Sequence, residues 1–242
     1  MRVIVLTSRG REVAARVAAE SIERWHPGAE IELVDLGPRA EVGMVGELRH
    51  SDVHVGLGPA WARWAALPSV LTSRLDDELV VLPDSVWLIG SDLPEAEGTT
   101  FLARHGDART GITYGGLVPE LLQVGPSSGE VLGWWTAQAV ASTCGDGLDA
   151  GVDPWSEFVS GGEGVTISSS GAFRLGPWLA PDADVVRLGD QVALDGSPVS
   201  IVHFPGFDPT EPFWWPNGDR RGTLLSGAPA MRPIVHAYAE AL

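Results

Sequence analysis

The segment 201–209 (Ile-Val-His-Phe-Pro-Gly-Phe-Asp-Pro) places a histidine and a glycine where a buried strand is predicted to end. Ligands of α/β sheets commonly bind at the carboxyl ends of strands. The neutral imidazole of His203 could ligate a divalent metal or donate a hydrogen bond to a phosphate, and Gly206 could let the backbone approach a diphosphate closely. The same pattern also fits a plainer interpretation, in which backbone groups satisfy His203 and Gly206 only serves a turn.

A carboxylate follows a second short apolar run in the same way. Asp84 comes just after residues 79–82 (Leu-Val-Val-Leu), in the sequence Pro83-Asp84-Ser85. A carboxylate at a strand end can ligate a hard divalent cation. Pro-Asp-Ser is also an ordinary turn sequence, and the spacing alone favours that interpretation.

Polar residues follow the first two predicted strands as well. Thr7, Ser8 and Arg9 end the run 2–7, and Asp35 lies near the end of the next apolar run. A nucleotide base and ribose would lie at this edge of a parallel sheet. No Gly-x-Gly-x-x-Gly follows the first strand, so the dinucleotide-binding fingerprint is absent, and Arg9 could equally be a surface charge.

The elements that must position these residues alternate between strands and helices. The predicted strands are 2–7, 31–36, 79–82, 86–89, 117–124, 165–167, 185–188 and 199–204. The predicted helices are 12–25, 61–75, 128–142 and 230–242, whereas 37–58 and 91–112 are predicted to be irregular. The buried face of the first helix is predicted to hold Val13, Val17, Ala18, Ser21 and Ile22. This alternation predicts one α/β domain with a mixed, mostly parallel sheet flanked by helices.

Charge limits the classes of function. The 242 residues include 32 acidic and 16 basic side chains, and every basic one is Arg. Nucleic acids and anionic membranes require a basic surface, so neither is an expected partner. A small phosphate ligand remains compatible, because a few Arg side chains and backbone N–H groups suffice for it. The absence of Lys excludes Schiff-base chemistry and a P-loop lysine.

The remaining composition points to a soluble protein. The single cysteine, Cys144, excludes a disulfide framework and a cysteine-cluster zinc site. No uninterrupted apolar run reaches the roughly 18 residues of a membrane-spanning helix. The first apolar run is too short for the core of a signal peptide. We therefore expect a cytoplasmic protein without an integral membrane segment.

Several of these motifs resemble those of GT-A fold, nucleotide-sugar-dependent glycosyltransferases, most nearly a bacterial glycosyltransferase-like domain. The family's late His-Phe-Ser-Gly-Phe-Asp-Pro run matches 203–209, with Pro205 in place of Ser. Its opening strand, loop and helix match 3–27, which ends in Ser-x-x-x-x-His-Pro. The Trp134-Trp135 helix and the closing helix are also similar.

The resemblance implies transfer of a sugar from a nucleotide sugar, expected to be a UDP-sugar, to an unidentified acceptor. It implies a nucleotide-binding half of about 1–90 and an acceptor and metal half of about 91–242. Nucleotide contacts would come from Thr7, Ser8, Arg9, Asp35 and Gly206. Asp84 and His203 would hold Mn²⁺ or Mg²⁺ near the diphosphate. No side chain stands out as a catalytic nucleophile.

The chain departs from the family at the metal site. The family's Asp-x-Asp corresponds to Pro83-Asp84-Ser85, so only the middle position keeps a carboxylate. Its Lys-Pro corresponds to Leu67-Pro68, which removes a cation facing the phosphates. These losses leave three alternatives open: a metal-independent arrangement of Arg and helix N-termini, binding without catalysis, or a degenerate, catalytically inactive paralogue. The inactive form would act as a binding or partner subunit, and a second transferase could work beside it.

Overall fold

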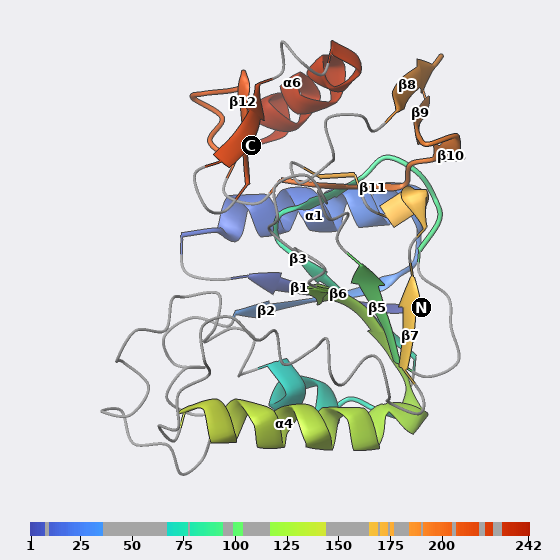
Figure 1. The fold of residues 1–242 in the computed structure, drawn as a ribbon, viewed down its shortest axis with the longest axis vertical. Coiled ribbons are helices and arrows are strands. Elements are labelled where there is room, and N and C mark those ends of the chain that lie inside the picture. Colours follow the sequence, from blue (N-terminus) through green and yellow to red (C-terminus); the bar gives the residue numbers. More distant parts are fainter. Residues whose placement is uncertain are drawn as a thin grey trace.

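A mixed six-stranded sheet lies at the centre of the computed structural model (Figure 1). The structure describes residues 1–7, 10–35, 67–76, 78–93, 99–103, 117–143, 165–168, 170–173, 175–176, 184–189, 191–204, 207–217, 221–224 and 229–242. The strand order is β2 (Glu30–Asp35), β1 (Arg2–Thr7), β3 (Leu79–Pro83), β6 (Leu117–Val124), β5 (Thr99–Ala103) and β7 (Val165–Ser168). β1 is parallel to both β2 and β3, and β5 is parallel to β7. Among these six strands, β6 alone runs antiparallel to its neighbours.

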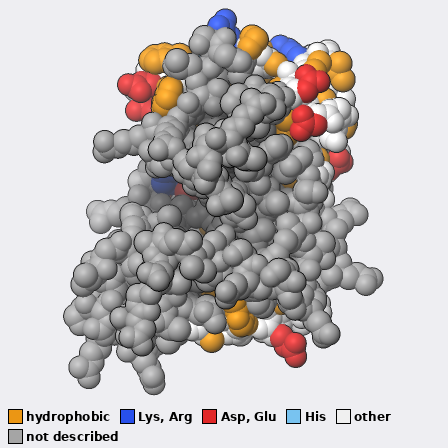
Figure 2. Space-filling view, viewed as in Figure 1, with side chains coloured by type: hydrophobic (Ala, Val, Ile, Leu, Met, Phe, Trp, Pro, Cys, Tyr) orange, Lys and Arg blue, Asp and Glu red, His pale blue; other side chains and the backbone are white. Residues whose placement is uncertain are grey.

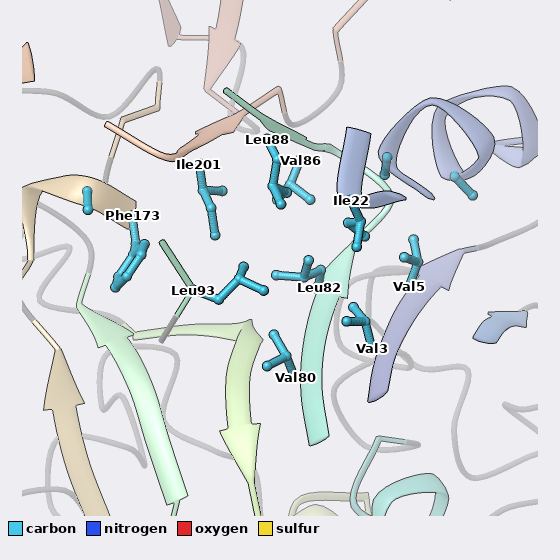
Figure 3. Close-up of a cluster of buried hydrophobic side chains, with 13 residues drawn as sticks. Val3, Val5, Ile22, Val80, Leu82, Val86, Leu88, Leu93, Phe173 and Ile201 are labelled. Atoms are coloured by element: carbon cyan, nitrogen blue, oxygen red, sulfur yellow. The ribbon is translucent and has the colours of Figure 1, made fainter. Parts of the chain in front are cut away.

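Helices cover both faces of this sheet, so the fold is a three-layer α/β arrangement (Figure 1). α1 (Glu12–Trp25) packs on one face and α4 (Gly129–Thr143) lies on the other. Strand alternation divides β1 between the layers: Val3 and Val5 join the cluster that contains Ile22 of α1, whereas Ile4 and Leu6 join the cluster of α4. Figure 3 shows the first cluster, in which side chains of β1, β3 and α1 meet Phe173 and Ile201.

The C-terminal part of the chain forms a further layer over α1 (Figure 1). β11 (Ile201–His203) pairs antiparallel with β4 (Val86–Leu88). The smaller strands are β8 (Val185–Leu188), β9 (Gln191–Leu194), β10 (Ser197–Pro198), β12 (Trp214–Asn217) and β13 (Arg221–Leu224). The 3₁₀ helices are η1 (Pro126–Ser128), η2 (Gly171–Phe173) and η3 (Pro229–Met231), and α6 (Arg232–Ala241) follows the last of them. A third apolar cluster joins α6 to β9 and β11 and includes Val202, Phe204 and Tyr238.

An ion pair fixes the edge strand β2 to the helical segment 67–72. Arg74 donates to both carboxylate oxygens of Glu32, at 2.6 and 3.2 Å. The hydrogen bond from the Arg74 guanidinium lowers the pKa of the Glu32 carboxyl group below its usual value. Among helices in the described part of the chain, none combines the length and apolar character needed to cross a membrane.

The sequence-based expectations are confirmed for the sheet and its main helices and are wrong at three places. β5 lies inside 91–112, where the sequence predicts irregular structure, because pairing with β6 and β7 stabilises a strand that has no clear alternation of its own. β9, β10, β12 and β13 are absent from the sequence-based prediction. Val13 is 42% exposed, since α1 buries a face that includes Ala14, Ala15 and Val17 instead. The expected excursion 37–58 and residues 61–66 lie outside the described residues.

Candidate functional site

Three of the predicted site residues lie at one edge of the sheet. Thr7 and Asp35 are partners in the parallel pairing of β1 with β2. Asp84 directly follows β3, and its backbone N–H donates to the carbonyl of Leu6, one residue before Thr7, at 2.8 Å. Because the three strands are parallel, their carboxyl ends meet here. Thr7 and Asp84 are buried, whereas Asp35 is exposed.

Asp84 is paired with a cation that sequence reasoning missed. The Nη2 atom of Arg11 lies 3.4 Å from Oδ1 of Asp84. Arg11 immediately precedes α1, and Gly10, with a φ of +86°, lets the chain turn into the helix. The Asp84 side chain is 2% exposed and that of Arg11 is 29% exposed. The site therefore combines a buried carboxylate with a guanidinium that reaches solvent. The sequence signal that could have identified Arg11 is its place as a basic residue in the loop before the first helix.

Tyr238 of α6, in the C-terminal layer, is within electrostatic range of this ion pair. Its phenol is almost fully buried, and burial raises its pKa to about 12. The positive charge of Arg11 lowers this pKa and the negative charge of Asp84 raises it, so both charges act on the hydroxyl group. The last helix of the chain thus contributes to the same region as the ends of β1 and β3.

The fold also brings the segment of His203 next to that of Asp84. His203 is opposite Val86 in the β4–β11 pairing, and the Phe204 N–H donates to the carbonyl of Ser85. The His203 imidazole is 1% exposed, and its Nε2 lies 2.9 Å from the carbonyl oxygen of Phe173. Since a carbonyl only accepts hydrogen bonds, Nε2 carries the proton and donates. The plainer interpretation, in which backbone groups satisfy His203, therefore holds for Nε2, whose hydrogen-bond partner is a backbone carbonyl.

The described residues, as arranged, do not fit a divalent cation. Such an ion prefers several oxygen ligands converging at short distance. In the described ranges no group of three or more His, Cys, Asp or Glu side chains could surround one. The Asp84 carboxylate is ion-paired to Arg11, and Nε2 of His203 is bonded to Phe173. The other predicted contacts, Ser8, Arg9 and Gly206, lie outside the described residues.

Basic and acidic side-chain atoms lie at the molecular surface near the N-terminal end of α1. Figure 2 shows them in the same orientation as Figure 1, between atoms of residues that the structure does not describe. The carboxyl ends of β1 and β2 point toward the same side of the molecule (Figure 1). The sheet edge that carries Thr7, Asp35 and Asp84 thus lies at the same end of the molecule as the start of α1.

Comparison with solved structures supports the fold. An active-site mutant of LgtC superposes with a TM-score of 0.53 at 16% identity, over 100% of this chain and 96% of that one. The chain has the GT-A fold. The galactosyltransferase LgtC in complex with donor and acceptor sugar analogs matches with a TM-score of 0.48 at 15% identity, over 100% and 96% of the two chains. The glycosyltransferase GlyE of Streptococcus pneumoniae TIGR4 matches with a TM-score of 0.43 at 11% identity, over 69% of this chain and 45% of that one.

Sequence comparisons give no further assignment for this GT-A chain. No family model matches the sequence. No curated protein matches it either.

Proposed function

We propose that this chain is a glycosyltransferase-like protein that binds a nucleotide sugar, a UDP-sugar, at the carboxyl ends of β1, β2 and β3. The supporting observation is the convergence of Thr7, Asp35 and Asp84 at this edge, within a fold shared with LgtC over the whole chain. Ligands of open α/β sheets bind outside the carboxyl ends of the strands. A nucleotide sugar is the ligand that the resemblance of 3–27 and 203–209 to GT-A glycosyltransferases implies.

In this proposal each residue has a distinct role. Asp35 accepts hydrogen bonds from the ribose hydroxyls, because it is the exposed carboxylate of the edge. Thr7, Ser8 and Arg9 contact the nucleotide, and Gly206 lets the backbone approach the diphosphate. Asp84 and His203 lie near the diphosphate, and Mn²⁺ or Mg²⁺ would join them only if their present partners were exchanged.

Calorimetric titration with UDP and UDP-sugars tests the proposal. We expect UDP to bind, and Asp35→Asn to weaken binding about tenfold, since hydrogen bonds to a charged group contribute roughly 1.5–3 kcal/mol. Asp184→Asn is the matched control, because Asp184 is also an exposed carboxylate but precedes β8. Absence of UDP and UDP-sugar binding by the folded wild type would refute the proposal.

A non-catalytic partner subunit is the second candidate. Among the described strands β8 lies at the edge of its sheet, and it exposes two apolar side chains, Val186 at 38% and Leu188 at 62%. Phe213 is 61% exposed as well. Exposed apolar residues on an unpaired strand edge are a common feature of surfaces that bind another chain. Release of free UDP from a UDP-sugar over time would favour the transferase, and tight UDP binding with no release would favour this second function.

A further inference from the structure

We infer that the diphosphate of the nucleotide is held by the Arg11 guanidinium and that this binding requires no divalent cation. The inference rests on the proposed function and specifies which side chain of the site binds the phosphate groups. A nucleoside diphosphate carries about two negative charges that need compensation in a confined site. The structure places a cation, Arg11, against the carboxylate of Asp84, which was expected to bind a metal.

The Asp84 carboxylate already has a positively charged partner, the guanidinium of Arg11. Its carboxylate is 2% exposed and lies 3.4 Å from Nη2 of Arg11. A divalent cation on the same carboxylate would stand beside the guanidinium, and the two positive charges would repel each other. Flanking residues add no carboxylate, because Pro83 and Ser85 occupy the neighbouring positions. A metal would therefore either displace Arg11 from its buried partner or bind the carboxylate against the repulsion of the guanidinium, and both are costly.

His203 does not supply the second ligand in this conformation. Its Nε2–H donates to the Phe173 carbonyl at 2.9 Å, and its backbone N–H donates to Leu175. Metal coordination through Nε2 would leave that buried carbonyl without its donor. The two residues expected to share a metal thus have separate partners.

Arg11 has the properties of an anion-binding residue. A guanidinium presents five N–H donors in a rigid fork that matches phosphate oxygens. Within the described ranges, Asp84 is the side chain that accepts a hydrogen bond from it. Its side chain is 29% exposed, so N–H groups that do not bond Asp84 can bind a ligand from solvent. Asp84 orients the guanidinium, and the start of the 14-residue helix α1 adds a partial positive charge nearby.

Titration of UDP in EDTA and in Mn²⁺ tests this inference. We expect the wild type to bind UDP in EDTA with an affinity within about threefold of that in Mn²⁺. Arg11→Gln is expected to lose at least about tenfold in affinity in EDTA, because it removes a charge-assisted contact to phosphate. Arg24→Gln is the matched control, since it removes one exposed positive charge from the last turn of the same helix and should change affinity less than about twofold.

Asp84→Asn distinguishes metal-dependent from metal-independent binding of UDP, because it should abolish the first and should not weaken the second. If Asp84 ligates a metal, the amide abolishes Mn²⁺-dependent binding. If Asp84 only orients Arg11, the amide still accepts its hydrogen bond while removing a negative charge, and UDP binds in EDTA at least as tightly as to the wild type. If circular dichroism shows that Arg11→Gln does not fold, this variant still decides whether binding requires a metal.

Each other outcome has a definite meaning. Binding of UDP only in Mn²⁺, lost in Asp84→Asn, would overturn the inference and leave the proposed function intact. Binding in EDTA that Arg11→Gln leaves unchanged would overturn the role of Arg11. No binding by the wild type in either buffer would overturn the proposed function itself.

Discussion

The ring of Tyr238 stacks on the ring of Phe204, with centroids 4.0 Å apart and planes inclined by 12°. Phe207 packs edge-on against Phe204 at 5.6 Å, and its centroid lies 5.5 Å from that of Tyr238. Tyr238 belongs to the last helix, whereas Phe204 directly follows β11 and is hydrogen-bonded to Ser85 beside Asp84. The stack therefore connects the C-terminal helix to the candidate site.

Removal of the Tyr238 ring should destabilise the whole domain. Truncation of a buried aromatic side chain to Ala costs about 3–5 kcal/mol, so Tyr238→Ala is expected to fall in that range. Tyr238→Phe keeps the stack and should cost about 1 kcal/mol or less. Urea unfolding followed by circular dichroism measures both. His236→Ala, on the exposed face of α6, serves as the control and should change stability by less than about 0.5 kcal/mol.

Ionisation of Tyr238 should also lower the free energy of unfolding at alkaline pH. Burial raises its pKa from 10.0 to about 12. A group whose pKa is higher in the folded state contributes stability that is complete below the unfolded value of about 10. That contribution is lost as pH rises toward about 12, because the unfolded chain releases the proton first. At about 1.36 kcal/mol per pKa unit, the loss is about 3 kcal/mol.

The pH dependence is measured by urea unfolding at four pH values from about 9 to about 12, which span the two pKa values. Tyr238→Phe has no phenol to ionise, so its stability should decline less than that of the wild type over this range. Equal declines in the two proteins would show that other groups cause the alkaline loss.

The fold was largely predictable because its main signals are local. The run 2–7 and the helical spacing of 12–25 gave elements with the bounds of β1 and α1. Parallel pairing then placed Thr7, Asp35 and Asp84 at one edge, as expected. β5 and β9 were missed because their stability comes from strands beside them rather than from their own patterns.

The site was less predictable because its contacts are remote in sequence. Arg11 and Asp84 are 73 residues apart, and His203 and Phe173 are 30 residues apart. Strand periodicity gives the position of Asp84 but not the cation that pairs with it. The sequence likewise gives His203 as a strand-end residue but not the carbonyl that accepts from its ring. Tyr238 belongs to an expected helix, and only tertiary packing brings it near both charges.

Gly90 should tolerate no side chain, because the backbone of Ser200 approaches it closely. A Cβ at Gly90 would lie 2.6 Å from Oγ and 3.0 Å from Cα of Ser200. Ser200 is held in place by hydrogen bonds from the backbone N–H groups of Ile89, at 2.8 Å, and Asp92, at 3.2 Å. Gly90→Ala is therefore expected to cost roughly 1–3 kcal/mol.

The control is a second glycine with open space around it. A Cβ at Gly133 in α4 would meet no atom within 4 Å, so Gly133→Ala should stabilise the helix by up to about 1 kcal/mol. Urea unfolding of both variants measures whether each substitution lowers or raises the free energy of unfolding. A Gly90→Ala protein as stable as the wild type would mean that the β4 and β11 segments separate easily.

His203 should be protonated at Nε2 in the folded protein, because that atom donates to the Phe173 carbonyl inside the apolar core. Nitrogen-15 NMR of the imidazole measures the protonated position directly. His203→Ala leaves the buried carbonyl unsatisfied and is expected to cost about 1–3 kcal/mol in urea unfolding. Addition of Mg²⁺ should leave the Nε2 resonance unchanged. A Nε2 that loses its proton when Mg²⁺ and UDP are added together would instead identify His203 as a metal ligand and exclude a purely structural role.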